Sequence, residues 1–313
     1  MFGFVLTAAV TVMHIYLTAR ACSIPWLRRY LPLPLIIGIG LASWLFFFLG
    51  RTYGWGPSGR FSIYLEIFGM DLMAVVFLLT VSLLAVDLAT GFGLLLKQWA
   101  PSLRGIALAF GALLGLFALI QGNRAPAVEA YEVYVPGLDD ELEGTVVVGL
   151  SDLHLESEVS AEWLGKRLRQ VQEQEPDLVV LLGDIFEGRR APAELLLEQF
   201  RGLDPPLGIW AVTGNHDSFL RREGSESLLE GAGIRYLRNS WREVRPGLVL
   251  AGIDDSRHRS REPGAKDPIV RSLEGRPPGS AIFLSHRPLQ AERLAGEGVD
   301  LMLSGHTHGG QIW

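Results

Sequence analysis

The sequence predicts an N-terminal α-helical membrane region of about four helices, followed by an α/β domain built on a mainly parallel sheet. Three observations predict it: an uneven distribution of charge, four long apolar runs in residues 1–124, and an alternation of strand and helix patterns after them. Residues 1–124 carry eight Lys or Arg and three acidic residues, a net charge of +5, whereas the rest of the chain carries −11. With 49% hydrophobic residues, the 313-residue chain is too apolar for a purely soluble enzyme.

Four apolar runs have close to the length that a bilayer-spanning helix requires, roughly 20 residues. They cover residues 2–17, 33–49, 67–86 and 103–120. A cleaved secretory signal would have basic residues before its apolar core, but no basic residue precedes Arg20. The sequence therefore predicts a multi-pass membrane anchor over residues 1–124.

The basic residues between the runs indicate how the anchor is oriented. The loops after the first and third runs hold five Lys or Arg, whereas the loop after the second run and the exit from the fourth hold three. Cytoplasmic loops are enriched in Lys and Arg, so the first set is expected to be cytoplasmic. An even number of spans leaves both flanks on one side, and the domain after residue 124 is therefore predicted to lie outside the cytoplasm.

Few polar side chains interrupt the apolar runs. Glu66 and Asp87 fall at the ends of the third run, where a carboxylate reaches lipid headgroups. Asp71 lies about one turn inside, so an interfacial position is favoured and a buried functional acid is the alternative. His14 is more typical of helix packing than of a ligand. Cys22 is the only cysteine, which excludes an intrachain disulfide and a cysteine-ligated zinc site.

From residue 125 onward the pattern changes to that of a soluble α/β domain. Residues 131–135 alternate with a period of two, and residues 145–150 form the continuous apolar run of a buried strand. Residues 161–174 place their apolar side chains on one helical face, with Ser160 as N-cap. Further strands are predicted over 177–182, 208–213, 248–253, 281–284 and 301–303, and further helices near 192–200, 225–230 and 289–294. Strands that alternate with helices indicate a mainly parallel sheet.

Polar side chains directly follow five of the predicted strands. Sites in such sheets lie beyond the carboxyl ends of the strands, so these segments are expected to converge. Each motif alone is more typical of a turn or a helix cap, but five in this order indicate a metal site. Asp152 and His154 are two residues apart, which in extended backbone directs both side chains the same way. The candidate ligands are Asp152, His154, Asp184, Asn215, His286, His306 and His308. Oxygen and imidazole ligands without a thiolate favour Mn, Fe or Zn.

Five motifs resemble, in the same order, those of the calcineurin-like metallophosphoesterases. They are Asp152-Leu153-His154, Gly183-Asp184-Ile185-Phe186-Glu187, Gly214-Asn215-His216-Asp217, Ser285-His286 and Gly305-His306-Thr307-His308. The Gly-His-Thr-His-Gly-Gly-Gln sequence that ends at Gln311 is similar to the membrane-associated bacterial branch of that superfamily, which implies a bacterial cell membrane. The resemblance covers residues 131–313 and implies a two-sheet sandwich with helices outside, so a metallophosphoesterase domain is expected over 125–313. Because this fold normally continues further, the end at Trp313 is expected to leave the domain incomplete.

The resemblance also implies a role for each matching residue. Two divalent or mixed-valence transition metal ions would be held. The implied sets are Asp152, His154 and His308 for one ion, Asn215, His286 and His306 for the other, and Asp184 between them. Two cations about 3.5–4 Å apart generate a hydroxide nucleophile from water and neutralise charge on a phosphoryl group.

His216 is implied to act on the phosphoryl group rather than on a metal. It would donate a hydrogen bond or a proton, because an imidazole titrates near neutral pH, and Asp217 would orient it. Glu187 stands where the family often carries Asp and is left outside the ligand set. Arg257, His258, Arg259 and Arg261 lie in a loop over residues 254–266, which is interpreted as solvated, with an anionic headgroup site as the alternative.

The implied activity is hydrolysis of a phosphoester or pyrophosphate bond by a membrane-anchored enzyme. The expected partners are a phosphorylated small molecule or a lipid-linked phosphate and the lipid bilayer, and no nucleic acid is expected. In the alternative, the helical region is the active part, as a sensor or transporter, and the soluble domain is a metal-binding regulatory module. The intact His216 disfavours that alternative, because regulation alone needs no general acid.

Overall fold

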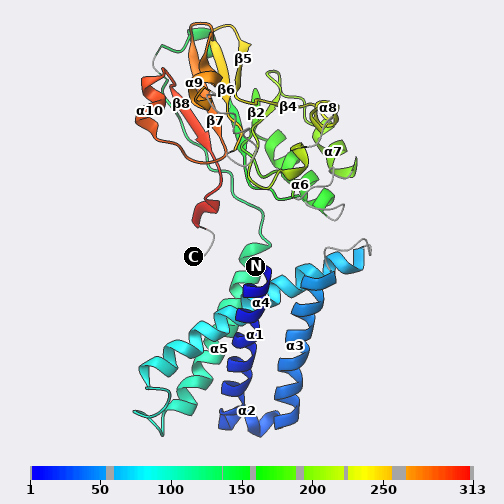
Figure 1. Cartoon of the computed structure of the whole chain (residues 1–313), viewed down its shortest axis with the longest axis vertical. Coiled ribbons are helices and arrows are strands. Elements are labelled where there is room, and N and C mark those ends of the chain that lie inside the picture. Colours follow the sequence, from blue (N-terminus) through cyan, green and yellow to red (C-terminus); the bar gives the residue numbers. More distant parts are fainter. Residues whose placement is uncertain are drawn as a thin grey trace. The chain divides into compact units, whose positions relative to one another are not determined.

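A computed structural model of the chain describes residues 2–53, 60–135, 137–155, 160–187, 194–221, 225–255 and 266–310. The chain divides into two compact units, residues 1–128 and 129–313 (Figure 1). Most of the arginine-rich loop, residues 256–265, and residues 311–313 lie outside the described ranges. The predicted fold class, apolar N-terminal helices followed by an α/β domain with two sheets, is confirmed.

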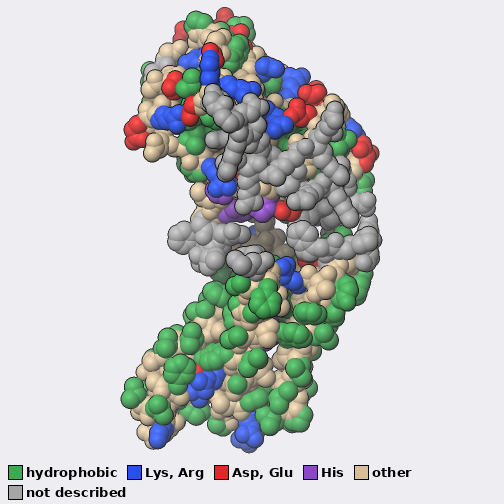
Figure 2. Space-filling model, in the orientation of Figure 1, with side chains coloured by type: hydrophobic (Ala, Val, Ile, Leu, Met, Phe, Trp, Pro, Cys, Tyr) green, Lys and Arg blue, Asp and Glu red, His purple; other side chains and the backbone are tan. Residues whose placement is uncertain are grey.

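The first unit is helical throughout its regular structure. Within the described residues, four helices are long and apolar enough to cross a membrane, which confirms the predicted apolar runs. They are α1 (Phe2–Cys22), α3 (Leu33–Tyr53), α4 (Arg60–Ala89) and α5 (Ala100–Gly122), and a short helix, α2 (Pro25–Tyr30), lies between α1 and α3. Figure 2 shows apolar side chains over much of the visible surface of this unit, as contact with lipid requires.

Helix α4 is central to the first unit because it contacts α1, α3 and α5. Small residues allow the helices to approach closely: a Cβ added at Gly111 of α5 would lie 2.9 Å from the Leu79 Cα on α4. His14 of α1 is buried, with Nδ1 2.8 Å from the Val10 carbonyl oxygen and Nε2 3.0 Å from the Ser43 hydroxyl on α3. These contacts are those of a helix-packing residue, as the sequence indicates.

A buried ion cluster joins α1, α4 and α5. Asp87 on α4 is fully buried and lies 2.6 Å from Arg20 Nε on α1 and 2.7 Å from Arg104 Nε on α5. The Tyr16 hydroxyl donates to the same carboxylate at 2.6 Å. Asp87 therefore does not reach lipid headgroups as expected, because cations from two neighbouring helices satisfy its charge inside the unit.

Replacing Asp87 with alanine is expected to destabilise the first unit strongly. The substitution leaves Arg104, which is also buried, without its carboxylate partner, and breaking a buried pair costs about 3–5 kcal/mol. Thermal unfolding of the full chain in detergent measures the effect. Asp71→Ala is the matched control, since Asp71 is an exposed carboxylate on the same helix. Equal unfolding temperatures for the two variants would contradict a stabilising role for the cluster.

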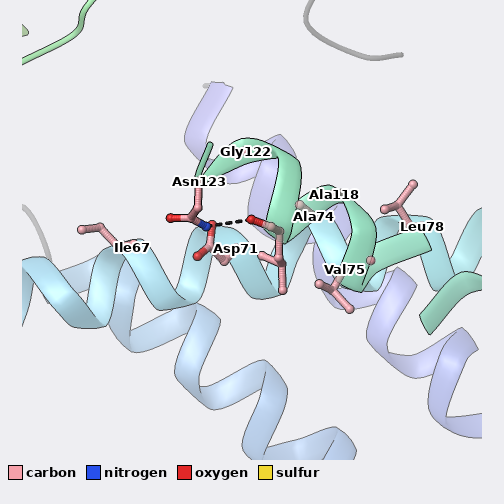
Figure 3. Close-up of a pocket in the computed structure, with 10 residues that line it drawn as sticks. Ile67, Asp71, Ala74, Val75, Leu78, Ala118, Gly122 and Asn123 are labelled. Atoms are coloured by element: carbon pink, nitrogen blue, oxygen red, sulfur yellow. Dashed lines mark hydrogen bonds between the residues drawn. The ribbon is translucent and has the colours of Figure 1, made fainter. Parts of the chain in front are cut away.

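Asp71 lines a cavity of about 220 Å³ between α4 and α5 (Figure 3). The opposite wall includes Gly122, the last residue of α5, and Asn123, whose Nδ2 donates to the Leu119 carbonyl at 2.8 Å. Because α5 ends at this point, the Asp71 carboxylate lies level with a helix end. This position favours the interfacial interpretation of Asp71 over a deeply buried acid.

The second unit contains two four-stranded sheets (Figure 1). The first sheet is parallel, in the order β1 (Val147–Leu150), β2 (Leu178–Leu181), β3 (Ile209–Ala211) and β4 (Ile234–Tyr236). The second has the order β5 (Ser240–Arg245), β6 (Leu248–Gly252), β7 (Ser280–Ser285) and β8 (Leu301–Ser304), with only the β5–β6 pair antiparallel. The mainly parallel pairing predicted from the strand and helix alternation is thus present in both sheets.

Side chains alternate along each buried strand and so divide between separate cores. On β2, Leu178 and Val180 belong to the core between the sheets, together with Leu250 of β6 and Leu284 of β7. Val179 and Leu181 of β2 belong instead to the core under the helices of the first sheet. Those helices are α6 (Ser160–Gln172), α7 (Glu194–Arg201) and α8 (Ser225–Glu230), and a third core joins the second sheet to α9 (Pro268–Leu273) and α10 (Ala291–Gly296). Helices therefore cover the outer faces of a sandwich.

Some local predictions differ from the structure. The alternating residues 131–135 form no strand, and Tyr131 and Tyr134 are 82% and 88% exposed. Alternation indicates a strand only where a partner strand and an apolar surface are available. Conversely, β4, β5 and α9 are not predicted, because they have only three to six residues and β5 carries several charged side chains.

Candidate metal centre

All seven candidate ligands lie in segments that follow strands. Asp152 and His154 follow β1, Asp184 follows β2 and Asn215 follows β3, whereas the three remaining histidines follow β7 and β8. Parallel strands end at one edge of each sheet, and here the edges of the two sheets meet. Donor atoms of six of these ligands gather in two groups, each with its atoms within 4.8 Å of one another: Asp152, His154 and His308 in the first, and Asp184, His286 and His306 in the second. A third such group, His154, Glu187 and His216, shares His154 with the first.

In the first group, two imidazoles and a carboxylate direct their donor atoms at one another. His154 Nε2 lies 3.4 Å from His308 Nε2, and His308 Nε2 lies 3.3 Å from Asp152 Oδ1. This Oδ1 atom is buried and makes no hydrogen bond within the described part of the chain. The second oxygen of Asp152 accepts from the His306 backbone N–H at 2.9 Å, which connects the segments after β1 and β8.

In the second group, His286 Nε2 is approached by three side chains, those of Asp184, His306 and the nearby Asn215. This atom lies 3.2 Å from Asp184 Oδ2, 3.2 Å from Asn215 Oδ1 and 3.1 Å from His306 Nδ1. His286 Nδ1 lies 2.9 Å from the Leu182 carbonyl oxygen, which only accepts hydrogen bonds, so Nδ1 carries the proton of the neutral ring. The neutral imidazole therefore turns a lone pair toward the other three side chains.

Asp184 lies between the two groups. Its Oδ2 is 3.2 Å from His286 Nε2 and 3.9 Å from His154 Nε2, and the residue is 2% exposed. Its Oδ1 accepts the His216 backbone N–H at 2.7 Å. Burial opposes ionisation, but the nearby His286 imidazole and the His216 backbone N–H hold the pKa of Asp184 below its ordinary value.

The arrangement fits bound cations. Lone pairs of imidazole, amide and carboxylate groups face one another at 3.1–3.4 Å, and such acceptors repel unless a cation or a proton lies between them. The two partner bonds made by Nδ1 atoms, from His286 to a carbonyl and from His154 to a carboxylate, are those that fix metal-ligating histidines in other proteins. Hard oxygen and imidazole donors without sulfur suit divalent transition metals.

Glu187 connects the first group to His216. Its two carboxylate oxygens lie 2.7 Å from His154 Nδ1 and 2.7 Å from His216 Nδ1. The hydrogen bond to Glu187 raises the pKa of His154, although burial opposes the shift. Burial alone would raise the pKa of Glu187, but hydrogen bonds from the two histidines hold it below its ordinary value. The ligand set predicted from the sequence omits Glu187. Its place at the end of the second motif is the sequence signal that could have indicated a role at the site.

Asp217 contacts other groups than the sequence implies. The expected neighbour of its carboxylate is the His216 ring, but its two oxygens accept four backbone N–H groups at 2.8–3.1 Å. The donors are Asp184, Ile185, Phe186 and Gly214. Burial raises the pKa of Asp217 to about 7, although hydrogen bonds from the Phe186 and Gly214 backbone N–H groups act to lower it. Asp217 therefore holds the loops after β2 and β3 together, and Glu187 contacts the His216 ring.

The backbone at the site adopts conformations that most side chains avoid. Asp152, His154, Asp184, His306 and His308 all have φ between 45° and 73°. The extended backbone expected for Asp152 and His154 is therefore not observed, and both side chains instead project from left-handed turns. A Cβ at Gly214 would collide with the Asp184 carboxylate and backbone nitrogen, so only glycine allows this approach. Such strain at several neighbouring residues is typical of functional sites.

His216 and Arg287 reach the open side of the site. The His216 side chain is 42% exposed, and its ring lies 5.0 Å from the His154 ring. Arg287 directly follows His286, and its guanidinium contacts Asn215 and His306. Figure 2 shows histidine side chains together at the surface of the second unit. The sequence reasoning does not single out Arg287, although its place beside His286 is a signal for it.

Comparison with known proteins agrees with this geometry. A family model described as calcineurin-like phosphoesterase matches residues 145–310, just over half of the chain. The Danio rerio transmembrane protein with metallophosphoesterase domain is 35% identical over 219 residues, which cover 66% of this chain and 50% of that protein. The Bos taurus protein of that name is 30% identical over 222 residues, with the same coverage. An uncharacterized metallophosphoesterase of Aquifex aeolicus is 33% identical over 170 residues, which cover 53% of this chain and 64% of that protein.

This chain spans about half the length of the two animal relatives. The matched segment nevertheless includes both sheets and all seven candidate ligands. A metal-dependent hydrolase domain accounts for the two-sheet fold, the ordered motifs and the convergent donor atoms together. The chain belongs to the calcineurin-like phosphoesterase family.

Proposed function

We propose that this protein is a membrane-anchored phosphoesterase that uses two metal ions. The observation that carries the proposal is the convergence of two donor groups and the nearby Asn215, with the buried Asp184 facing a histidine of each group. Seven ligands with one shared carboxylate are too many for a single ion. Asp152, His154 and His308 would hold one cation, and Asn215, His286 and His306 the other.

Divalent Mn, Fe or Zn at these positions would lower the pKa of a water nucleophile and offset negative charge on the phosphoryl group. Residues of the protein would hold the metal ligands in position. Asp184 and Asp217 keep the ligand loops in place through the backbone contacts described above. His154 is held by Glu187 so that its Nε2 faces the site.

His216 is proposed to protonate the leaving group. Its side chain is 42% exposed, so a substrate can reach it, and its Nδ1 lies 2.7 Å from Glu187 Oε1. This contact holds the ring in one orientation and leaves Nε2 to face the leaving-group oxygen. Glu187 therefore takes the orienting role that the family resemblance implied for Asp217.

The substrate is proposed to be a phosphorylated small molecule or, favoured by the anchor, a lipid-linked phosphate. Four membrane-capable helices and the names of two relatives as transmembrane proteins support membrane attachment. The acidic charge of residues 125–313, a net −11, disfavours nucleic acid as a partner. A purely regulatory metal-binding module would explain the donor groups but not His216, which is exposed and oriented by Glu187.

The catalytic unit is proposed to lie outside the cytoplasm as part of a multi-pass bacterial membrane protein. The basis is the excess of Lys and Arg in the loops after the first and third spans. A protease added to intact spheroplasts is then expected to cleave the region after Arg124. Protection of that region until the cells are lysed would place it in the cytoplasm, where a cytosolic or inner-leaflet substrate would be sought instead.

The activity is tested with the full chain purified in detergent, stripped by chelation and reloaded with Mn²⁺, Fe²⁺ or Zn²⁺. Turnover is measured on a phosphomonoester, a phosphodiester, a pyrophosphate and a long-chain lipid phosphate. We expect hydrolysis of at least one class that chelation abolishes and metal restores. Stoichiometric metal binding without turnover on any class would favour the regulatory alternative.

A further inference from the structure

Arg287 is held by a rigid anchor at the edge of the metal centre. Its Nε lies 2.6 Å from Asp255 Oδ2, and the Asp255 side chain is 1% exposed. The Asp255 backbone N–H donates to the Thr213 hydroxyl at 2.9 Å, and the Ser285 hydroxyl donates to the Arg287 carbonyl at 2.8 Å. Segments after β3, β6 and β7 therefore fix both the backbone and the guanidinium of Arg287.

The two terminal nitrogens of Arg287 point at two of the proposed ligands. Its Nη2 donates to Asn215 Oδ1 at 3.0 Å, and its Nη1 lies 3.1 Å from His306 Nε2. The side chain remains 39% exposed, so the guanidinium also faces the open side of the site. A cation therefore stands beside the proposed ligands without being one of them.

The contact between Nη1 and His306 depends on which ring nitrogen carries the proton. His306 Nδ1 faces His286 Nε2 and is the atom available to a metal, in which case the neutral ring carries its proton on Nε2. Arginine has only N–H donors, and two donors form no hydrogen bond. Nη1 would then be available, without moving, to an acceptor on the open side of the site.

We propose that this acceptor is an unesterified phosphoryl oxygen of the substrate. The inference rests on the proposed function and names the recognition group for its substrate. Guanidinium N–H groups match phosphate oxygens in geometry and charge. A terminal phosphate offers three unesterified oxygens and up to two negative charges, whereas a diester offers two oxygens and one charge. Arg287 thus favours phosphomonoesters or terminal pyrophosphates over diesters.

The test uses inorganic phosphate as the probe and the full-length, metal-loaded protein in detergent. Phosphate affinity is measured by calorimetry for wild type, Arg287→Ala and Arg287→Lys, and metal content is measured by elemental analysis. Arg293→Ala is the matched control, because Arg293 pairs with Asp267 on the surface of the same unit. We expect Arg287→Ala to keep its metals and to bind phosphate roughly ten- to a hundredfold more weakly. Arg287→Lys should be intermediate, and the control unchanged.

Steady-state kinetics supply a second readout. Arg287→Ala should raise KM for a monoester more than for a diester, a difference that a general loss of folded protein would not produce. Phosphate affinity within about twofold of wild type, or loss of a metal in Arg287→Ala, would overturn the inference and make Arg287 a support for the ligand residues. Absence of phosphate binding by the wild type would overturn it as well. If the wild type binds phosphate through Arg287 but hydrolyses no ester, the proposed function fails and the recognition role stands.

Discussion

Asp184→Asn is expected to release both metal ions and to abolish nearly all turnover. The Asp184 carboxylate faces both donor groups, with Oδ2 3.2 Å from His286 Nε2 and 3.9 Å from His154 Nε2. Asparagine has no negative charge and offers only one acceptor oxygen. In Asp184 one oxygen, Oδ1, already accepts the His216 backbone N–H, so the single oxygen of asparagine would have to serve that contact as well as the metal ions. Changes in groups that merely support ligands cost ~10–100-fold in affinity, so loss of the shared carboxylate should cost more than that.

Elemental analysis of the reconstituted full chain measures this effect. Wild type should hold two ions per chain, Asp184→Asn close to none, and His154→Ala mainly the ion of the second group. Asp300→Asn is the control, because this carboxylate contacts the Ala281 backbone away from the site. One ion or fewer in the wild type, or two in Asp184→Asn, would contradict the shared-carboxylate arrangement.

His216→Ala is expected to keep both metals and to lose turnover by ~10²–10⁴ on an alkyl phosphoester. The ring is placed by Glu187 and contacts neither Asp184 nor His286 through its nitrogens, whereas its backbone N–H holds Asp184. Alanine keeps that backbone contact and removes only the imidazole. An aryl ester should lose much less, because its leaving group departs without protonation.

The comparison of the two esters separates a proton donor from other roles. Equal losses on both substrates would identify His216 as a clamp for the phosphoryl group, and loss of a metal would identify it as a ligand. The Glu187→Gln variant gives a further test, since it keeps a hydrogen-bonding side chain but removes the negative charge beside His216 and His154. It should reduce alkyl-ester turnover less than His216→Ala does.

Elements with strong local signals were predictable. Helix α8 has the predicted bounds, and β2, β6 and β7 lie within or close to the predicted runs, because buried parallel strands are continuous apolar segments. The short strands β4 and β5 have little apolar pattern and exist because a neighbouring strand offers its hydrogen bonds. Residues 131–135 show the converse, since their pattern has no partner strand.

The sequence by itself determined the membrane-capable helices, the α/β class and the group of residues that converge at the site. Apolar length, strand and helix period, and the order of motifs after strands are local properties that a single chain displays. Only the tertiary structure decided which groups those residues contact. Glu187 rather than Asp217 holds His216, Asp87 pairs with two arginines, and Arg287 stands beside Asn215. Each of these contacts joins residues 17 to 72 positions apart in the sequence. They depend on burial and charge that exist only after the elements pack.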